Sequence, residues 1–400
     1  MADSIGVRVL VADDDPIQRD RLKIALEGWG YDVVCAPNGR AAWETLRNDD
    51  TFSILVTDWL MPELDGTELC RLVRESPRSR YLPILLLTSR TRQEDLIEGL
   101  NAGADAFITK PCDPPLLLAQ IRIAERILEL EERLATQVGE LRSVNQRLET
   151  DLASAAEVQL SLLPERAPRI NGVDFAWVYE ACDRLGGDMF NVFTLDDRHV
   201  GMYVLDVSGH GTPAALQSVT LSHVLAPFDV PGAVLKRGNR GRERYSVAPP
   251  AEVARKLNAQ FPLIERSGQF FTFLYGVLDV KTLVVRYVCA GHPGPIVSSK
   301  GRVRYLEKGD GIPVGITNDA IYDEQQVQLQ AGDQLVFYTD GVLETMSASG
   351  EAFGLDRLVG ALSQRVPIRE NLSRLHERLE QFGRGEPRHD DVTIVGLEVG

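Results

Sequence analysis

The chain has 400 residues, which at about 150 residues per domain predicts two or three domains. Hydrophobic residues make up 44% of the chain and charged residues 25%, which excludes a disordered or collagen-like protein and predicts a folded, soluble one. Lys plus Arg total 43 against 58 for Asp plus Glu, and the net charge of −15 argues against binding to nucleic acid or to an anionic membrane.

The cysteines occur singly, without a CxxC pair, and their number is odd, so we expect reduced thiols in a cytoplasmic protein. They are Cys35, Cys70, Cys112, Cys182 and Cys289. No segment approaches the ~20 consecutive apolar residues that a membrane helix needs. The sequence therefore predicts neither a disulfide framework nor a membrane span.

Short apolar segments alternate with amphipathic ones over the first 125 residues. The strand-like segments read VRVLVA, DVVCA, SILVTD, PILLLTS and AFITK. Helices are expected over 16–29, from 39, from 66, over 92–101 and from 114. Five strands separated by helices specify an α/β doubly wound fold with a five-stranded parallel sheet, whose functional residues gather at the carboxyl ends of the strands.

Polar residues stand at those carboxyl ends. Asp13 and Asp14 follow the first strand, and Asp58, Thr88 and Lys110 follow the third, fourth and fifth. Three carboxylates at one edge repel one another unless a cation such as Mg²⁺ neutralises them. A hydroxyl and an ammonium facing the same crevice would suit a phosphoryl group. Taken singly, each of these residues could equally be a loop residue that caps a helix.

The segment over residues 117–163 contains one Gly and no Pro, and its apolar residues recur every seven positions. The repeat comprises Ile127, Leu134, Leu141, Leu148, Ala155 and Leu162, with Leu130, Val144 and Val158 at the companion position. This pattern predicts a long helix that ends before Pro164 and forms a parallel coiled coil. Gln137 and Asp151 weaken the seam, so a single amphipathic helix packed on a neighbouring domain is the alternative.

After residue 171 the pattern changes to strands joined by short turns. The strands read VDFAWVYE, HVGMYVLDV, FFTFLYGVLD, LVVRYVCA, QLVFYTD and DVTIVGLEV, with helices expected near 212–226 and 250–261. This order predicts an α+β sandwich of two antiparallel sheets flanked by helices. The basic stretch KRGNRGRER, within residues 229–250, is interpreted as a mobile, solvated insertion rather than a phosphate-docking segment.

Acidic residues recur in tight turns of this second region. They are Asp188 in RLGGDMF, Asp206 in VLDVSGHG, Asp340 in FYTDGVLE, and Asp390 and Asp391 in RHDDVT. Strand-end carboxylates brought together make a multi-metal site, in which two Mg²⁺ or Mn²⁺ ions hold a hydroxide for in-line attack on phosphorus. As isolated residues they would be ordinary hairpin-turn residues, since Asp-Gly is a common turn.

Residues 8–125 resemble the CheY-like receiver domain of bacterial response regulators. The motifs VADDDP, VTDWLMPELDG, LLLTS and NAGADAFITKP occur in order and without a gap. The resemblance implies that Asp58 accepts a phosphoryl group from a sensor histidine kinase or phosphotransfer protein. It also implies that Asp14 and Asp58 bind Mg²⁺ directly and that Asp13 supports the ion through water.

The same resemblance assigns the remaining receiver positions. Thr88 and Lys110 would contact the phosphoryl group, and Thr88 and Phe107 would form the switch, with Phe107 as its aromatic residue.

Residues 159–399 resemble the metal-dependent PPM family of serine/threonine phosphatases, in its SpoIIE-like and RsbU-like branch. The matching pieces include QLSLLP, GGD, DVSGHGTPAAL, YVCAGHPGPIV, GDQLVFYTDGVLET and DDVTIV. The resemblance implies that Asp206 bridges two metals beside the backbone carbonyl of Val207, and that Asp340 and Asp390 complete the second site. Asp188 would reach the first metal directly or through water.

Two histidines in these motifs are left open between a role near the site and a satisfied loop residue. They are His210, next to Gly211, and His292. Met189 and Phe190 follow GGD, where RsbU-like sequences often carry a tyrosine and an aspartate.

Two other functions are alternatives to a phosphatase. GGDMF behind a receiver and a long helix invites comparison with a diguanylate cyclase, but Met189 replaces the acidic fourth residue of the cyclase motif GGDEF, and the segment lies only about 25 residues beyond the helix. A catalytically silent PPM-fold binding module is the second alternative. A DNA-binding output is disfavoured because no basic recognition helix is present.

These expectations combine into a response regulator of three parts: a receiver over residues 1–125, a helical coiled-coil linker over 126–163 and a PPM-type phosphatase over 164–400. The resemblance implies a substrate phosphorylated on serine or threonine, typically a STAS-type anti-anti-sigma factor, and a homodimer without nucleic-acid or membrane partners. The phosphorylated receiver would act on the phosphatase through the helix after Pro114. Whether phosphorylation activates or inhibits, and whether Mn²⁺ or Mg²⁺ is used, is open.

Overall fold

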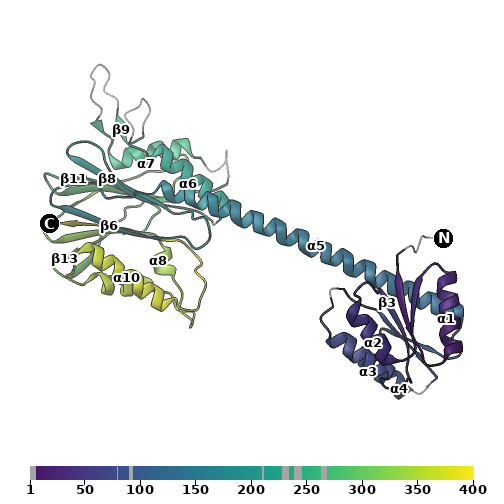
Figure 1. Cartoon of the computed structure of the whole chain (residues 1–400). Helices are drawn as coiled ribbons and strands as arrows, with labels where there is room; N and C mark the ends of the chain where they lie inside the picture. Colours follow the sequence, from purple (N-terminus) through teal and green to yellow (C-terminus); the bar gives the residue numbers. More distant parts are fainter. Residues whose placement is uncertain are drawn as a thin grey trace. The chain divides into compact units, whose positions relative to one another are not determined.

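The computed structural model describes residues 6–78, 80–89, 93–209, 211–227, 234–237, 246–262 and 268–400. Contacts between residues divide the chain into two compact units, Met1–Gln146 and Arg147–Gly400. Each unit has its own sheet structure and core (Figure 1).

The first unit is built on a parallel sheet of order β2-β1-β3-β4-β5. Its strands are β1 (Arg8–Ala12), β2 (Asp32–Ala36), β3 (Ile54–Asp58), β4 (Ile84–Thr88) and β5 (Ala106–Thr109). The helices that follow them are α1 (Pro16–Gly28), α2 (Gly39–Asn48), α3 (Gly66–Glu75), α4 (Gln93–Asn101) and α5 (Pro114–Ser161). The predicted doubly wound α/β fold is confirmed.

The two faces of this sheet bury separate apolar clusters. Leu10 and Leu55 belong to one cluster, and Val9 and Val11 belong to the other, because alternate side chains of a strand point to opposite faces. Strands β3 and β4 are buried at every residue, as expected for central parallel strands covered by helices on both sides. Asp65 starts α3 with a capping box, which fixes the chain directly after the loop that follows Asp58.

The second unit contains two antiparallel sheets of five strands each, in the orders β15-β12-β11-β8-β7 and β14-β13-β16-β17-β6. The first sheet comprises β7 (Met189–Thr194), β8 (His199–Val207), β11 (Phe271–Asp279), β12 (Val284–Ala290) and β15 (Gln325–Gln328). The second comprises β6 (Val173–Glu180), β13 (Ile296–Ser299), β14 (Arg302–Tyr305), β16 (Asp333–Tyr338) and β17 (Val392–Val399). The predicted α+β sandwich is confirmed.

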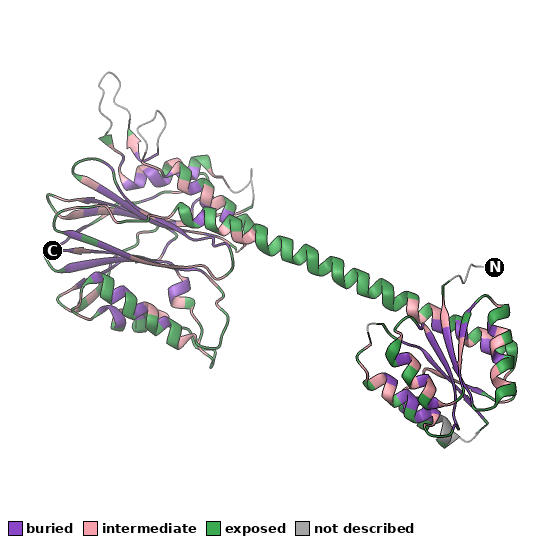
Figure 2. Ribbon diagram, in the orientation of Figure 1, coloured by how far each residue is buried: buried purple, intermediate pink, exposed green. Residues whose placement is uncertain are grey.

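Helices cover the outer faces of both sheets (Figures 1 and 2). They are α6 (Thr212–Val224), α7 (Pro250–Gln260), α8 (Gly341–Glu344), α9 (Gly354–Leu362) and α10 (Ile368–Phe382). Leu221 and Leu257 of α6 and α7 pack in a cluster with the first sheet, and Leu375 of α10 packs with the second. Phe190 and Phe337 lie in the apolar layer that joins the two sheets.

The expected long strands and the helices α6 and α7 are present, whereas several short strands and two further helices were not predicted. Strands β13, β14 and β15 have four residues each, too few for an alternating pattern to stand out. Strand β7 begins inside the GGDMF motif, and α9 and α10 occupy residues to which no helix was assigned.

The predicted long helix is confirmed as α5, which ends at Ser161, before Pro164. Leu117, Ile121 and Ala124 of its first turns are buried in the core of the first unit. Farther along, its large apolar side chains are exposed (Figure 2). They are Leu130, Leu134, Val138, Leu141, Val144, Leu148 and Val158.

The basic insertion is only partly described. Strands β9 (Lys236–Arg237) and β10 (Ser246–Val247) pair with each other at its base. Residues 228–233 and 238–245 lie outside the described residues, so the prediction of a mobile loop stays a prediction.

Within the described parts of the chain, no helix carries an apolar stretch long enough to cross a bilayer.

Candidate active sites

The first candidate site lies at the carboxyl ends of β1 and β3, where the strand order reverses and open α/β sheets bind ligands. Asp13 is fully buried after β1, Asp14 is exposed beside it, and Asp58 is the buried last residue of β3. One carboxylate oxygen from each of the three lies within 4.8 Å of the others. This set of hard oxygen ligands fits Mg²⁺.

Lys110 supplies positive charge to this cluster. Its Nζ atom lies 2.9 Å from Oδ2 of Asp13 and 2.9 Å from Oδ1 of Asp58. The backbone N–H of Trp59 donates to the same oxygen of Asp58 at 2.8 Å. Burial raises the pKa of Asp58, and the hydrogen bonds to both aspartates outweigh burial and raise the pKa of Lys110. An ammonium is therefore held where a phosphoryl group on Asp58 would need neutralising.

Thr88 and Phe107 lie on the neighbouring strands. Thr88 is the fully buried last residue of β4, and the backbone N–H of Lys110 donates to its carbonyl at 2.7 Å. Phe107 lies in β5, opposite Leu86, and is half-buried against the core. The structure thus places all five predicted polar residues at one sheet edge, with the aromatic residue beside them.

The second candidate site lies where strands of both sheets in the second unit end. Asp206 is the penultimate residue of β8, and Asp188 immediately precedes β7 in the first sheet. Asp340 follows β16 as the N-cap of α8, and Asp390 precedes β17 in the second sheet. These four predicted metal ligands are far apart in sequence but lie close enough for their charges to act on one another.

Asp188 is held by two threonines. Its Oδ2 atom accepts hydrogen bonds from Thr339 Oγ1 at 2.8 Å and from Thr393 Oγ1 at 2.6 Å. The Thr393 backbone N–H donates to Thr339 Oγ1 at 3.0 Å, which links the two threonines. All three side chains are buried. Asp188 is thereby fixed in position although it stands in a turn.

The acids of this site repel one another. Burial, together with the negative charges of Asp340, Asp390, Asp391 and Glu344, raises the pKa of Asp206 to about 8. A cation bound beside Asp206 would oppose this shift and favour the ionised carboxylate.

The pKa values of the neighbouring acids Asp390 and Asp188 are raised as well. Burial raises the pKa of Asp390 to about 6. Burial and the charges of Asp206 and Asp391 raise the pKa of Asp188, although the two threonine hydrogen bonds oppose the shift. Buried carboxyl groups with raised pKa values fit Mg²⁺ or Mn²⁺, because these ions prefer oxygen ligands and favour the ionised form of each carboxyl group.

Among the described residues, no three of the acids in this site have oxygens that all lie within 4.8 Å of one another.

Two glycines allow the backbone to approach closely here. A Cβ atom on Gly341 would lie 2.0 Å from the carbonyl oxygen of Asp391. A Cβ atom on Gly187 would lie 2.9 Å from the carbonyl oxygen of Val207. The Val207 carbonyl, a predicted metal ligand, therefore lies beside the GGD turn that carries Asp188.

Asp391 has a different task from its neighbour Asp390. Its Oδ1 accepts from the backbone N–H of Cys182 at 2.7 Å, and its Oδ2 accepts from the backbone N–H of Asp188 at 3.1 Å. Asp391 is 4% exposed, so both bonds are protected from water. It braces the turn that presents Asp188.

The end of α5 contacts the same turn. Gln159, which is 4% exposed, donates from Nε2 to the Gly186 carbonyl at 2.6 Å and accepts the Gly186 N–H at 3.1 Å. Its Nε2 also lies 3.1 Å from Ser218 Oγ of α6. A movement of this part of α5 would act directly on the residues next to Asp188.

Several residues of the site were not singled out from the sequence. They are Gln159, Thr339, Asp391 in its bracing role, Thr393 and Glu344. The threonines stand in TDG and DDVT, next to predicted ligands, so their position was a usable signal. The predicted His210 lies outside the described residues, whereas His292 is buried and hydrogen-bonded.

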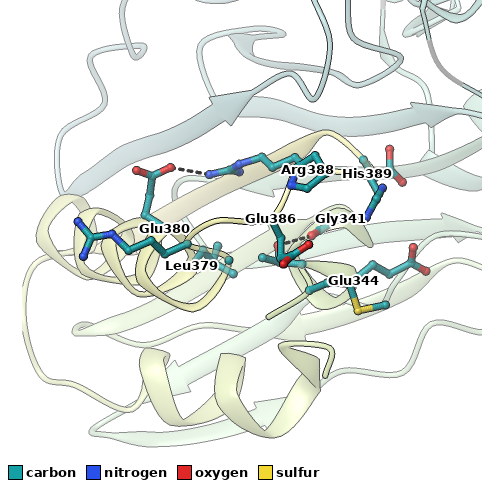
Figure 3. Close-up of a pocket in the computed structure, with 13 residues that line it drawn as sticks. Gly341, Glu344, Leu379, Glu380, Glu386, Arg388 and His389 are labelled. Atoms are coloured by element: carbon teal, nitrogen blue, oxygen red, sulfur yellow. Dashed lines mark hydrogen bonds and ion pairs between the residues drawn. The ribbon is translucent and has the colours of Figure 1, made fainter. Parts of the chain in front are cut away.

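A pocket of about 280 Å³ adjoins this site (Figure 3). Gly341, Glu344 and Asp390 line it on the side of the acids. Arg388, in the segment that leads to Asp390, is fixed by ion pairs to Glu180 at 2.6 Å and to Glu380 at 2.8 Å. The pocket therefore has one ordered, polar wall next to a predicted metal ligand.

Comparison with known proteins supports both units. Residues 196–400 match the family model of Stage II sporulation protein E (SpoIIE), and residues 9–122 match that of the response regulator receiver domain. Response regulator MprA of Mycobacterium ulcerans is 41% identical over 128 residues, which are 32% of this chain and 54% of MprA. Chemotaxis protein CheY1 of Helicobacter pylori is 35% identical over 118 residues, 29% of this chain and 95% of CheY1. The chain thus spans about half the length of MprA.

The solved SiaA-PP2C domain of Pseudomonas aeruginosa has the same fold as the second unit. The TM-score is 0.54 at 19% identity, covering 64% of this chain and 99% of that domain. In this fold Met189 and Phe190 are core residues of β7, buried in two different apolar clusters. The last two residues of GGDMF are therefore buried strand residues of a PP2C-like fold, which argues against the cyclase alternative.

Proposed function

The chain belongs to the SpoIIE family and carries a receiver domain and a protein serine/threonine phosphatase domain of the PPM type, and from this we propose a phosphatase controlled by its receiver. Phosphorylation of Asp58 would control metal-dependent hydrolysis of phosphoserine or phosphothreonine on a partner protein. The observation that carries this proposal is the convergence of Asp188, Asp206, Asp340 and Asp390, on which mutual repulsion and burial act together.

Each acid has a proposed task. Asp206 would contact both cations, with the carbonyl of Val207 as a ligand beside it. Asp340 and Asp390 would complete the second site, and Asp188 would serve the first directly or through water. Two bound Mn²⁺ or Mg²⁺ ions would supply an activated water and neutralise the phosphoryl oxygens. The chain itself orients the ligands: Thr339 and Thr393 fix Asp188, and the backbone turn at Gly341 fixes Asp340.

The substrate we propose is a phosphorylated STAS-type anti-anti-sigma factor, as the RsbU-like motifs of the sequence imply. The pocket beside Asp390 supports a protein substrate, because residues flanking the phosphoserine could enter it while the phosphate lies at the acids. Glu344, Met346 and Glu386 line this pocket, so apolar and polar side chains of the substrate would both find partners.

In the receiver, Asp58 would attack the phosphorus of a phosphohistidine, and the phosphorus–nitrogen bond would break. A Mg²⁺ ion held by Asp13, Asp14 and Asp58 would neutralise the transferred charge. Lys110 already contacts the acceptor carboxylate, and the buried hydroxyl of Thr88 stands at the same edge. Thr88 and Phe107 would then report the phosphorylated state to the receiver surface.

Helix α5 would carry the signal. It shares the receiver core through Leu117 and Ile121, and it reaches the turn of Asp188 through Gln159. Its exposed apolar residues at heptad spacing support a parallel homodimer. A change in how two copies of the helix pair would move Gln159 and, with it, Gly186.

A metal-dependence assay tests the proposed catalysis. The full chain is given a phosphoserine peptide, and Mn²⁺-dependent phosphate release is measured for the wild type, Asp340→Asn and the control Asp356→Asn. Asp356 is an exposed residue in the first turn of α9. We expect Asp340→Asn to lose more than about 100-fold in rate, because a ligand itself is removed, and Asp356→Asn to match the wild type. Equal rates in all three proteins would refute the proposed metal site.

A further inference from the structure

His292 is a buried histidine that the proposed function does not use. It stands in the loop after β12, within the motif AGHPGP, and is 1% exposed. Burial lowers its pKa to about 3, so the ring is neutral at physiological pH. A buried polar ring is retained at a cost unless both of its nitrogens are hydrogen-bonded.

Both nitrogens of this ring have partners. Nε2 lies 3.0 Å from the carbonyl oxygen of Tyr338, and Nδ1 lies 2.6 Å from Oγ1 of Thr272. A carbonyl only accepts hydrogen bonds, so Nε2 carries the proton and donates it. In a neutral ring Nδ1 then has a free lone pair and accepts from the Thr272 hydroxyl. The donor and the acceptor of each of the two hydrogen bonds are therefore fixed.

The partners belong to different sheets. Thr272 lies in β11 directly opposite Asp206 of β8 in the strand register of the first sheet. Tyr338 is the last residue of β16 in the second sheet, two residues before Asp340. His292 thus joins the strand pair that carries Asp206 to the strand that leads into Asp340.

We propose that His292 is a positioning residue that sets the spacing between Asp206 and Asp340, and so the affinity of the metal site. This inference rests on the proposed metal site. The apolar layer between the two sheets is held by hydrophobic burial, which is non-directional. The two directional hydrogen bonds of His292 would fix the position of one sheet relative to the other at the edge that carries Asp206 and Asp340.

The test measures Mn²⁺ binding to the full chain by titration calorimetry, together with the thermal midpoint without metal. All proteins, the wild-type reference included, carry Asp14→Asn in the receiver, which removes a predicted ligand of the receiver's cation site. His292→Leu removes both hydrogen bonds, and Thr272→Val removes one while keeping its shape. Thr272→Ser keeps the hydroxyl and serves as the conservative rescue. We expect the Mn²⁺ dissociation constant to rise about 10- to 100-fold in His292→Leu and Thr272→Val, and Thr272→Ser to stay close to the wild type.

A control separates this role from simple loss of stability. Asn371 is fully buried in α10 and donates to Gln334 at 2.8 Å, at the opposite end of β16 from Asp340. Asn371→Leu should lower the thermal midpoint without changing Mn²⁺ affinity. If His292→Leu does not fold, Thr272→Val and Thr272→Ser carry the comparison.

The outcomes are distinct for the inference and for the proposed function. Mn²⁺ affinity unchanged in Thr272→Val and in folded His292→Leu, with only the thermal midpoint lowered, would overturn the positioning role and leave the metal site standing. A wild type that binds no Mn²⁺ would overturn the proposed function itself. Weaker binding in Thr272→Val, restored in Thr272→Ser, would establish the bridge.

Discussion

Neighbouring acids in this chain have different tasks because their surroundings differ. Asp391 accepts hydrogen bonds from two backbone N–H groups and so stabilises the turn that carries Asp188. Asp390, next to it, is half-buried and is repelled by the other acids. In the receiver, by contrast, Asp58 has Lys110 beside it. An ammonium thus lies among the acids of the receiver, whereas the charges that act on Asp206 in the second unit are those of other acids.

The buried His292 predicts a pH dependence of stability. Its pKa is about 3 in the folded chain, below the ordinary value of 6.5, so the unfolded chain binds a proton first as the pH falls. Stability contributed by His292 is therefore complete above pH 6.5 and is lost on acidification. Compared with His292→Gln, the wild type should lose about 2–3 kcal/mol more between pH 6.5 and 4.5.

Urea unfolding of both proteins at the two pH values, with a chelator present, measures this difference. Groups other than His292 titrate in both proteins and cancel in the comparison. Parallel pH dependence of the wild type and His292→Gln would mean that the ring is protonated in the folded chain as readily as in the unfolded one.

The acids of the site can be recognised from the sequence, but the residues that hold them in position cannot. Asp206 and Asp340 stand at strand ends in Gly-containing turns, which is a local pattern and can be recognised from a single sequence. The hydrogen bonds of Thr393 to Asp188 and of Gln159 to Gly186 join residues about 200 and 27 positions apart, and only the packed sheets bring them together. Such contacts leave no periodic signal.

At the scale of elements, the turn between β16 and α8 decides where Asp340 points. A Cβ atom on Gly341 would meet the carbonyl oxygen of Asp391 at 2.0 Å, so the turn and the start of β17 would have to separate. Gly341→Ala should destabilise the phosphatase domain by about 1–3 kcal/mol and weaken Mn²⁺ binding. Differential scanning calorimetry and Mn²⁺ titration check the two effects.

Gly360 offers a matched control. It lies inside α9, and a Cβ atom there would meet nothing within 4 Å. Gly360→Ala should therefore stabilise the chain by up to about 1 kcal/mol through helix propensity alone. Destabilisation of equal size in both variants would show that close approach at Gly341 is not the cause.

The long strands could be predicted from the sequence, whereas the four-residue strands and the helices α9 and α10 could not. The strands of the first unit and β6, β8 and β17 show continuous apolar or alternating runs, which tertiary packing then completes. Strands β13, β14 and β15 form only because their backbone pairs with longer neighbours. Their four residues carry too little pattern to be distinguished from loops.

At the scale of the whole molecule, the exposed apolar residues of α5 are the basis of the proposed dimer. Leu141 and Leu148 are 62% and 55% exposed in one copy and repeat at heptad spacing. Replacing both by Asp should convert a dimer into a monomer, because charges would lie in the seam. Sedimentation equilibrium measures the mass, with Arg142→Gln plus Glu149→Gln, which lie away from the seam, as a surface control. A wild type that is monomeric at micromolar concentration would contradict the coiled coil.

The measurement that tests the whole account is Mn²⁺-dependent phosphate release from a phosphorylated STAS protein, with and without beryllofluoride bound to the receiver. The wild type should hydrolyse the substrate at a rate that changes with beryllofluoride. Asp58→Asn should hydrolyse it at a rate that does not change, and Asp340→Asn should not hydrolyse it. A rate that is the same with and without beryllofluoride in the wild type, or hydrolysis that persists in Asp340→Asn, would contradict a receiver-controlled metal phosphatase.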